Sequence, residues 1–417
     1  MLNNKKYTFI DLFAGCGGLS EGFLQTDSFE GLAHVEWELP MVNTLRHRLN
    51  QKWDHSEEES KKRVIHFDIQ KSSELINGNW SKESISAFGS TNHLEIVSNG
   101  LKGIVGDQKV DLIIGGPPCQ AYSIAGRAQD KNSMKEDYRN YLFESFVKVV
   151  DAFQPSVFVF ENVPGMLSAM PGNKLVSERV FEAFKQSNYE IRFPKDLKKS
   201  IYTASDFGVP QKRNRVIIIG VKNGSGLNLE DLYTQVDSLK TNELKTVKDA
   251  IGNLPSLIPL NSTKKVNGKN VSHELKNNEA EVQFHQPRFH NDRDVRFFKE
   301  WLNQGMNKKS SIDKINFYND RLSKQSNHAK YRNLEWDKPS PTIVAHLYKD
   351  GLMFLHPDEK QARSITVKEA ALLQSFPNDF EFVGSQGVAF KMIGNAVPPE
   401  LARNLGLGIL KELNKIQ

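Results

Sequence analysis

Cysteine is scarce in this chain, which has two among its 417 residues, Cys16 and Cys119. They are far apart in the sequence, and each lies in a stretch rich in glycine or proline. This number and spacing argue against a disulfide framework and against a cysteine-ligated zinc site. We therefore expect the protein to work in a reducing compartment, the cytoplasm.

Long apolar runs are missing as well. No run approaches the roughly 20 residues that a membrane-spanning helix requires, and the first expected strand, residues 7–13, begins too early to leave room for a signal peptide. Hydrophobic residues make up 38% of the chain and charged residues 25%, as in ordinary globular domains, and the length allows two domains. The sequence predicts neither secretion nor a membrane partner.

A strong overall charge is also lacking, since the formal net charge is +5. The cations are unevenly distributed, however, because residues 261–335 contain 15 Lys and Arg against 9 Asp and Glu. A polyanion would be a natural partner for this segment. A solvated Lys-rich and Asn-rich surface explains the same charge, so charge alone does not decide between the two.

The first half of the chain alternates between apolar strands and helical segments. Helices are expected from about residue 19, up to residue 45, and over residues 138–153, whereas residues 72–108 are polar and are interpreted as an insertion. This alternation predicts an α/β fold, with a parallel sheet covered by helices on both faces. The expected strands are residues 7–13, 32–36, 64–68, 110–114, 157–161 and 215–220.

The alternation stops after residue 220. A polar segment rich in Lys, Asn and Ser, with few clear strands, continues to about residue 333, and order returns at residues 340–347. Thr366 and Glu369 then have the spacing of a capping box at the start of a helix, and a final helix follows residue 399. The pattern predicts a large α/β domain interrupted by a smaller, irregular, basic one.

A glycine-rich turn follows the first expected strand. Gly15, Gly17 and Gly18 would let backbone N–H groups at the start of a helix approach an anionic or carboxylate-bearing ligand. Glu36 ends the second strand about 20 residues later, where an acidic side chain takes ribose hydroxyls. This pairing predicts a cofactor that contains a nucleoside, and NAD would satisfy it as well as other candidates. Three further side chains could contact an adenine ring, namely Phe13, Trp37 and Asp68.

The stretch Gly115-Gly116-Pro117-Pro118-Cys119-Gln120 follows the apolar strand at residues 110–114. Because ligands gather beyond the carboxyl ends of strands in α/β sheets, and paired prolines stiffen the loop, Cys119 is placed where a nucleophile is expected. The alternative is a small apolar filler beside a turn. The hexapeptide as a whole favours a catalytic role for Cys119 over a packing role.

Charged residues follow the next strands. Glu161 ends the strand at residues 157–161 and could act as a general acid or anchor a ring nitrogen, although a helix cap or an ion pair would also explain it. Arg213 and Arg215 lie next to the last expected strand and could reach the same edge of the sheet. A solvated turn is the alternative for these cations.

In the order of its motifs along the chain, the sequence resembles that of the DNA (cytosine-5)-methyltransferases of bacterial restriction-modification systems. The resemblance is carried by Phe-Ala-Gly-Cys-Gly-Gly from Phe13, Val-Glu-Trp-Glu from Val35, the Pro-Pro-Cys-Gln stretch, Glu-Asn-Val from Glu161, Gln-Lys-Arg-Asn-Arg from Gln211, and Gly-Asn-Ala-Val-Pro-Pro from Gly394. One departure is Ala121-Tyr122, where the family commonly has Pro-Phe. The resemblance implies a Rossmann-like, S-adenosylmethionine-dependent methyltransferase fold with a smaller target-recognition domain.

The resemblance also implies a reaction. The thiolate of Cys119 would attack carbon 6 of a cytosine flipped out of the DNA duplex. Glu161 would hold ring nitrogen 3 and the amine, and Arg215 with Arg213 would bind the carbonyl oxygen. Carbon 5 would take the methyl group from S-adenosylmethionine. By matching position, the cofactor pocket would be lined by Phe13, Ala14, Gly15, Gly17, Gly18, Glu36, Trp37, Asp68, Ile69, Pro117 and Asn395.

Residues 1–245, completed by residues 376–417, would form the catalytic domain, and residues 246–375 the target-recognition domain, whose cations would contact the phosphates of double-stranded DNA. The His285 to His290 cluster matches no standard metal spacing, and no metal is expected. The implied partners are DNA and, without a stable complex, a cognate restriction endonuclease; a monomer is expected. A tRNA cytosine-5 methyltransferase of the same fold, and a regulatory protein without catalysis, are the alternatives.

Overall fold

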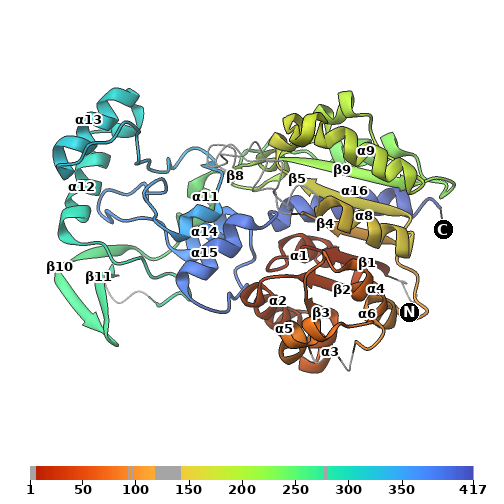
Figure 1. Ribbon diagram of the computed structural model, residues 1–417. Helices are drawn as coiled ribbons and strands as arrows, with labels where there is room; N and C mark the ends of the chain where they lie inside the picture. Colours follow the sequence, from red (N-terminus) through yellow and green to blue (C-terminus); the bar gives the residue numbers. More distant parts are fainter. Residues whose placement is uncertain (1–5, 93, 95–96, 118–141, 277–279, 417) are drawn as a thin grey trace.

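The computed structural model describes residues 6–92, 94, 97–117, 142–276 and 280–416 (Figure 1). Cys119 and the first part of the helix expected at residues 138–153 lie outside the described residues. Within the described part of the chain, no helix has both the length and the apolar character to cross a lipid bilayer.

Eight described strands form the central sheet, in the order β3-β2-β1-β4-β5-β9-β6, with β7 also paired to β9. The strands from β3 to β5 are parallel, whereas β9 runs antiparallel to β5. The expectation of a parallel strand at residues 215–220 is therefore wrong in direction. The strands are β1 (Tyr7–Leu12), β2 (Phe29–Glu36), β3 (Val64–His66), β4 (Leu112–Gly115), β5 (Val157–Asn162), β6 (Tyr189–Glu190), β7 (Ile201–Thr203) and β9 (Asn214–Lys222).

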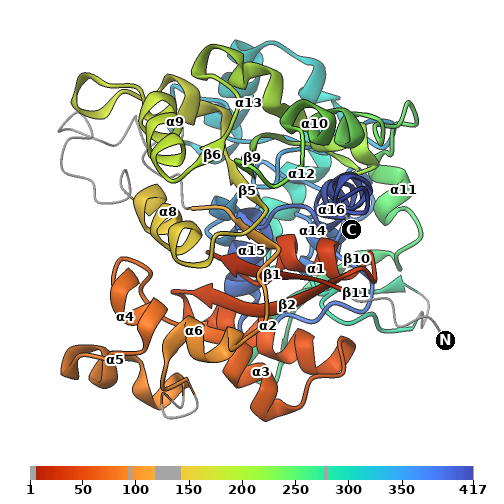
Figure 2. The same ribbon diagram turned by 90° about the vertical axis from the view of Figure 1, so that its right-hand side faces the viewer.

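Helices cover both faces of this sheet, as predicted (Figure 2). One face packs against α4 (Ser72–Asn77), α6 (Gly100–Val105), α8 (Leu142–Phe153) and α9 (Val176–Gln186). The other packs against α1 (Gly18–Leu24), α2 (Leu39–Lys52), α10 (Leu229–Asp237) and α16 (Pro399–Leu413). The short helix α3 (Glu57–Arg63) leads into β3.

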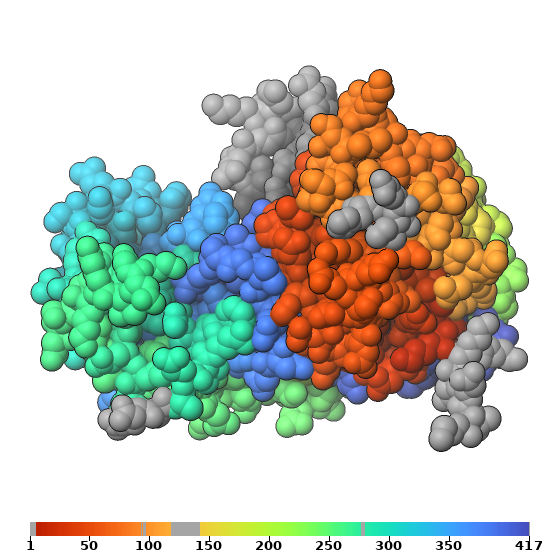
Figure 3. Space-filling model, turned by 90° about the horizontal axis from the view of Figure 1, so that it is seen from below, coloured from red at the N-terminus to blue at the C-terminus, as the bar shows by residue number. Residues whose placement is uncertain are grey.

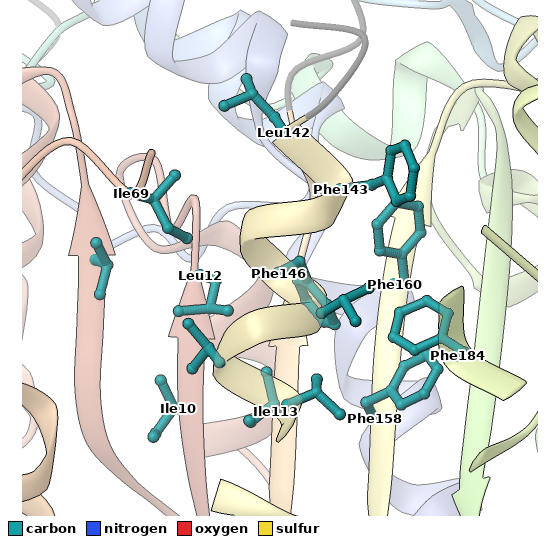
Figure 4. Packing of buried hydrophobic residues seen from close by; sticks show 14 of the residues in the cluster. Ile10, Leu12, Ile69, Ile113, Leu142, Phe143, Phe146, Phe158, Phe160 and Phe184 are labelled. Atoms are coloured by element: carbon teal, nitrogen blue, oxygen red, sulfur yellow. The ribbon is translucent and has the colours of Figure 1, made fainter. Parts of the chain in front are cut away.

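Helix α8 shows how sequence spacing produces this packing. Phe143, Phe146 and Val150 recur at helical intervals and are all buried, so that one face of the helix lies on the sheet. Figure 4 shows Phe146 above β4 and β5, beside the rings of Phe158 and Phe184. Those two rings are stacked, with centroids 4.0 Å apart. Aromatic packing thus fixes β5 beneath α8 and α9.

The polar stretch at residues 72–108 is more ordered than its composition indicates. It forms α4, α5 (Lys82–Asn92) and α6, and it contributes Leu75, Ile76, Leu101 and Val105 to the core on one face of the sheet. These apolar residues are few and lie on single faces of short helices, so average polarity hides them. The stretch is an insertion that packs against the sheet.

The region that follows residue 245 also contains more regular structure than expected. An antiparallel hairpin, β10 (Leu257–Val266) and β11 (Lys269–Leu275), is followed by α12 (Asp292–Asn303) and α13 (Ser311–Leu322). The two helices share an aromatic core that includes Phe297, Trp301, Phe317 and Tyr331. We refer to residues 1–245 as the first region and to residues 246–375 as the second region. A short helix, α11 (Val247–Ile251), opens it.

The predicted capping box is confirmed at α14 (Val367–Leu373), where the Thr366 hydroxyl accepts from the backbone N–H of Glu369 and the Glu369 carboxylate accepts from that of Thr366. Helix α14 packs with α15 (Gln386–Asn395) in a core that also includes Cys16 and Met41 from the first region. On the face shown in Figure 3, blue C-terminal residues lie between the second region and the red and orange first region. The expected domain boundaries remain predictions.

Candidate active site

The candidate site lies where the strand order of the sheet reverses. The chain proceeds from β1 outward to β2 and β3, and then returns to place β4 and β5 on the other side of β1. Ligands of open α/β sheets bind beyond the carboxyl ends of the strands at such a switch point. Leu12 pairs with Gly115, and Gly115 pairs with Phe160. The next residues, Phe13, Gly116 and Glu161, therefore lie at one level, where β1 and β4 have ended and β5 is still paired with β9.

The glycine-rich turn after β1 has an unusual backbone. Gly17 has a φ of 92°, and Phe13 has a φ of 60°, which a non-glycine residue rarely adopts. The α-carbon of Gly18 faces the C-terminal segment, because a Cβ there would lie 2.5 Å from the carbonyl oxygen of Val397. This close approach places Ala396 and Val397 against the glycine-rich turn, and Asn395, which is exposed at the end of α15, directly precedes them.

Glu36 connects this turn to the end of β2. Its carboxylate accepts from the backbone N–H of Gly15 (2.8 Å) and from that of Glu38 (2.7 Å). Burial raises the pKa of this carboxyl, while the two backbone donors oppose the shift. Each oxygen keeps a lone pair for a further donor, as a ribose hydroxyl would require.

The remaining residues predicted for the cofactor surround this edge. Trp37 is 57% exposed directly after Glu36, whereas Asp68 is half-buried and Ile69 buried after β3. Phe13 is half-buried, and Ala14 and Pro117 are buried. An exposed indole beside a carboxylate with spare lone pairs fits an adenosine group, with stacking for the base and hydrogen bonds for the sugar.

Glu161 is the centre of the second half of the site. Its carboxylate forms an ion pair with Arg215, with 2.6 Å between Oε1 and Nε, and both side chains are largely buried. The antiparallel direction of β9 explains this contact, since the start of β9 lies at the carboxyl end of β5. Asn162 donates from its side-chain nitrogen to the carbonyl of Pro117 at 3.4 Å. The first residues of the loop that leads to Cys119 are thus attached to β5.

Gly116 has no room for a side chain, because a Cβ would lie 2.6 Å from Oε2 of Glu161. We expect Gly116→Ala to displace the carboxylate or the loop and to lower kcat roughly 10²-fold, the loss that a misplacement of about 1 Å can produce. Steady-state kinetics of the purified variant would check this.

Gly387→Ala is the matched control, since a Cβ there meets no atom closer than 4.0 Å. Its kcat should equal that of the unmodified protein. An unchanged kcat in Gly116→Ala would show that this close contact does not limit the reaction.

Arg213 uses its guanidinium to bind backbone carbonyls. It is 1% exposed, and it donates to the carbonyls of Ile343 (2.8 Å) and Gly394 (3.1 Å). Burial, with a contribution from Arg215, lowers its pKa well below the ordinary value for arginine. Its predicted contact with the target base stays a prediction; in this structure the side chain links the second region to α15.

Gln211 makes a similar link that the sequence interpretation missed. Its Oε1 accepts from the backbone N–H of Ile343 at 2.9 Å, and its Nε2 donates to Gln374. The same segment forms β8 (Gln211–Lys212), which pairs in parallel with β12 (Ser340–Pro341). Buried and exposed residues alternate from Gln211 to Asn214. Because all four residues are polar, the sequence contained no signal for which of these side chains face inward.

His285 and His290 lie in a buried histidine cluster of the second region, with His273 and His356. His285 contacts the Pro255 carbonyl (2.8 Å) and the Thr366 hydroxyl, and His290 contacts Ser364. Among the described residues, no group of three or more His, Cys, Asp or Glu side chains is arranged to hold a metal ion.

This cluster predicts acid sensitivity. Burial lowers the pKa of His273 to about 4 and those of His290 and His356 to about 3, against an ordinary value of 6.5. The unfolded chain therefore binds more protons than the folded one once the pH falls below 6.5. The free energy of unfolding therefore has its full value above pH 6.5. It decreases as the pH falls toward the pKa values of the histidines in the folded protein, by roughly 1.4 kcal/mol per pH unit for each histidine.

Urea unfolding monitored by tryptophan fluorescence at pH 8 and pH 5 would measure this loss. His290→Gln should reduce the pH dependence, and replacement of the exposed His328 by Gln should leave it unchanged. An equal pH dependence in all three proteins would contradict the prediction.

The fold and the site define an α/β enzyme. A glycine-rich turn of the kind that binds nucleoside cofactors follows β1, and the end of β5 carries a carboxylate paired with an arginine. The chain belongs to the C-5 cytosine-specific DNA methylases, because residues 7–101 and 85–411 match that family. It is a DNA (cytosine-5-)-methyltransferase of the type II restriction-modification class, which implies a double-stranded DNA substrate.

Two curated relatives span almost the whole chain. The type II methyltransferase M.Bpa9945I of Bacillus paralicheniformis is 33% identical over 97% of this chain and 99% of its own length. The type II methyltransferase M1.HphI of Haemophilus parahaemolyticus is 30% identical over 97% of this chain and 87% of its own.

Solved structures show the same fold. A prophage-encoded protein of E. coli, described as a DNA modification methyltransferase, aligns with a TM-score of 0.63 at 23% identity, covering 98% of this chain and 100% of its own. The S. pombe Dnmt2 methyltransferase aligns with a TM-score of 0.55 at 15% identity, again over 98% of this chain and 100% of its own. The Rossmann-like methyltransferase fold predicted from the sequence is confirmed.

Proposed function

We propose that this enzyme methylates carbon 5 of a cytosine that is flipped out of a specific double-stranded DNA sequence, through a covalent adduct with Cys119. The observation that carries the proposal is the Glu161–Arg215 ion pair, which lies against Gly116, three residues before Cys119 in the sequence. A buried acid and a fixed cation at this place fit a cytosine ring, which has a ring nitrogen and an amine on one side and a carbonyl oxygen on the other.

The proposed chemistry divides between these groups. The Cys119 thiolate adds to carbon 6 as ring nitrogen 3 gains a proton from solvent, and the Glu161 carboxylate accepts hydrogen bonds from that N–H and from the amine, which stabilises the charge that develops there. Arg215 binds the carbonyl oxygen, and its ion pair keeps Glu161 oriented. Addition at carbon 6 makes carbon 5 nucleophilic. After methylation, loss of the carbon 5 proton releases Cys119 and restores the double bond.

The proposed cofactor is S-adenosylmethionine, which supplies the methyl group when bound. Glu36 would accept from the ribose hydroxyls, Trp37 and Phe13 would contact the adenine, and Asp68 and Ile69 would border it. Gly15, Gly17 and Gly18, with Ala14, Pro117 and Asn395, would surround the amino-acid part. Support for this comes from the backbone-anchored carboxylate of Glu36 beside the exposed indole of Trp37.

We further propose that the second region contacts DNA through its basic residues, that the enzyme acts as a monomer in the cytoplasm, and that it protects DNA from a cognate restriction endonuclease without forming a stable complex with it. The cations of the hairpin, Lys264, Lys265 and Lys269, are exposed and could reach phosphates.

Bisulfite sequencing of plasmid DNA from cells that express the protein would test the function. Cytosines resistant to conversion at one short motif, absent in cells with empty vector, are the expected result. Parallel methyl-transfer assays with duplex DNA and with tRNA would decide the substrate class. Transfer to tRNA alone, with uniformly converted plasmid DNA, would refute the proposed substrate.

A further inference from the structure

The insertion carries an aromatic cluster to the cofactor side of the sheet. Phe88, on α5, has its ring centroid 5.0 Å from that of Phe67, 5.1 Å from that of His66 and 6.2 Å from that of Trp37. The ring of Trp80 makes an edge contact with that of Phe67, with centroids 4.9 Å apart. One side chain of the insertion therefore contacts both the end of β3 and the indole beside Glu36.

The backbone of Trp37 is held by His66 of β3, and His66 in turn contacts helix α5. Burial lowers the pKa of His66, so the imidazole is neutral and has one N–H donor. Its Nε2 lies 2.8 Å from the carbonyl oxygen of Trp37, and its Nδ1 lies 2.8 Å from the hydroxyl of Thr91. Neutral His66 can donate to the carbonyl of Trp37. The Thr91 hydroxyl lies between Nδ1 of His66 and the carbonyl of Phe88 (2.9 Å), and its single hydrogen serves one of these two acceptors.

Helix α5 is firmly attached to the sheet edge. The side chain of Asn92 bonds both the N–H and the carbonyl of His66, as a neighbouring strand would. Arg46 donates to the Thr91 carbonyl at 2.8 Å, and Lys71 donates to the hydroxyl of Ser84 at 2.9 Å. These contacts fix the position of the Phe88 ring relative to β2 and β3.

We propose that Phe88 is a positioning residue for the cofactor, which acts through Trp37. This inference rests on the proposed use of S-adenosylmethionine. A tryptophan that is 57% exposed can adopt several rotamers, and the edge-to-face contact with Phe88 selects one of them before the cofactor binds. The insertion thereby acts as the outer wall of the adenine site.

Isothermal titration of the full-length protein with S-adenosylmethionine would test this role. Phe88→Ala should weaken binding roughly 3- to 10-fold, the range expected for loss of one aromatic contact and its preorganisation. 5′-Methylthioadenosine, which has the adenine but not the amino acid, should lose affinity by the same factor. The affinity for cognate DNA and kcat at saturating cofactor should be unchanged.

Two variants separate positioning from general stability. Phe88→Tyr keeps the ring and should bind the cofactor as the unmodified protein does. Phe88→Leu keeps apolar volume without the ring and should show the weakened cofactor binding expected for Phe88→Ala. It therefore provides the test if the alanine variant fails to fold. Ile85→Ala, at a side chain 52% exposed on the same helix, is the matched control and should bind as the unmodified protein does.

The outcomes are distinguishable. If folded Phe88→Leu or Phe88→Ala binds S-adenosylmethionine as tightly as the unmodified protein does, the inference is wrong. An equal loss of affinity for the cofactor and for DNA would also overturn it, because it would indicate a structural role. If the unmodified protein itself binds neither S-adenosylmethionine nor 5′-methylthioadenosine, the proposed cofactor is refuted, and the inference about Phe88 with it.

Discussion

Replacing Cys119 with alanine is expected to abolish methyl transfer while S-adenosylmethionine still binds. Without the thiolate no bond can form to carbon 6, so carbon 5 stays unreactive, and a loss of roughly 10⁴- to 10⁶-fold is the scale seen when an enzyme loses its nucleophile. The residues proposed for the adenosine group, Glu36 and Trp37, are untouched. Transfer of labelled methyl groups to duplex DNA, together with cofactor titration, would measure both effects.

The other cysteine of the chain provides the control. Cys16 is 1% exposed, and burial raises the pKa of its thiol to about 12, so it stays protonated near neutral pH. Cys16→Ala should retain turnover. DNA that carries 5-fluorocytosine cannot lose a proton from carbon 5 and should trap a covalent complex with the unmodified protein and with Cys16→Ala, but not with Cys119→Ala. Retained turnover in Cys119→Ala would refute the assigned nucleophile.

The second large effect is expected for Glu161→Gln. Glutamine has nearly the same shape, but it lacks the charge that pairs with Arg215 at 2.6 Å and that would stabilise a protonated ring nitrogen. We expect kcat to fall roughly 10²- to 10³-fold, as for loss of one preorganised electrostatic group. Single-turnover kinetics with saturating DNA and cofactor would separate this loss from any change in binding.

Glu190→Gln, at an exposed position of β6, is the matched control and should leave kcat unchanged. The Arg215→Gln variant and the double variant complete the comparison. Because the two side chains act as a unit, the double variant should lose much less than the product of the two single losses. A single-turnover rate in Glu161→Gln equal to that of the unmodified protein would contradict the assigned role.

Much of the catalytic fold could be predicted because its strands are short apolar runs at regular intervals. The expected strand at residues 157–161 corresponds to Val157–Asn162, and the expected strand at residues 7–13 to Tyr7–Leu12. The direction of β9 could not be predicted, since an apolar run reads the same for both directions. Helix α12 was missed although Asn291 has the character of an N-cap and Phe297, Phe298 and Trp301 form a buried helical face, because the many charged residues around them hid the pattern.

The site residues were more accessible to sequence reasoning than their contacts. Glycines and charged residues at strand ends pointed to Gly15, Glu36 and Glu161, since strand ends of a parallel sheet meet at one edge. The partners of these residues depend on tertiary structure. The Glu161–Arg215 pair requires an antiparallel β9, and the contact between Phe88 and Trp37 requires an insertion to fold back onto the sheet.

The link made by Gln211 and Arg213 has a consequence for exchange of DNA specificity between enzymes. In the second region, both side chains bond backbone atoms of Ile343, and β8 meets β12 through main-chain pairing. We call the contact of these two side chains and of β8 with residues 340–343 the seam. A recognition segment grafted from another methyltransferase would need to follow the same backbone path at the seam, whereas the identity of its side chains there would matter little. Chimeras joined outside residues 340–343 should keep the seam, whereas a junction inside it would separate the new segment from its anchor.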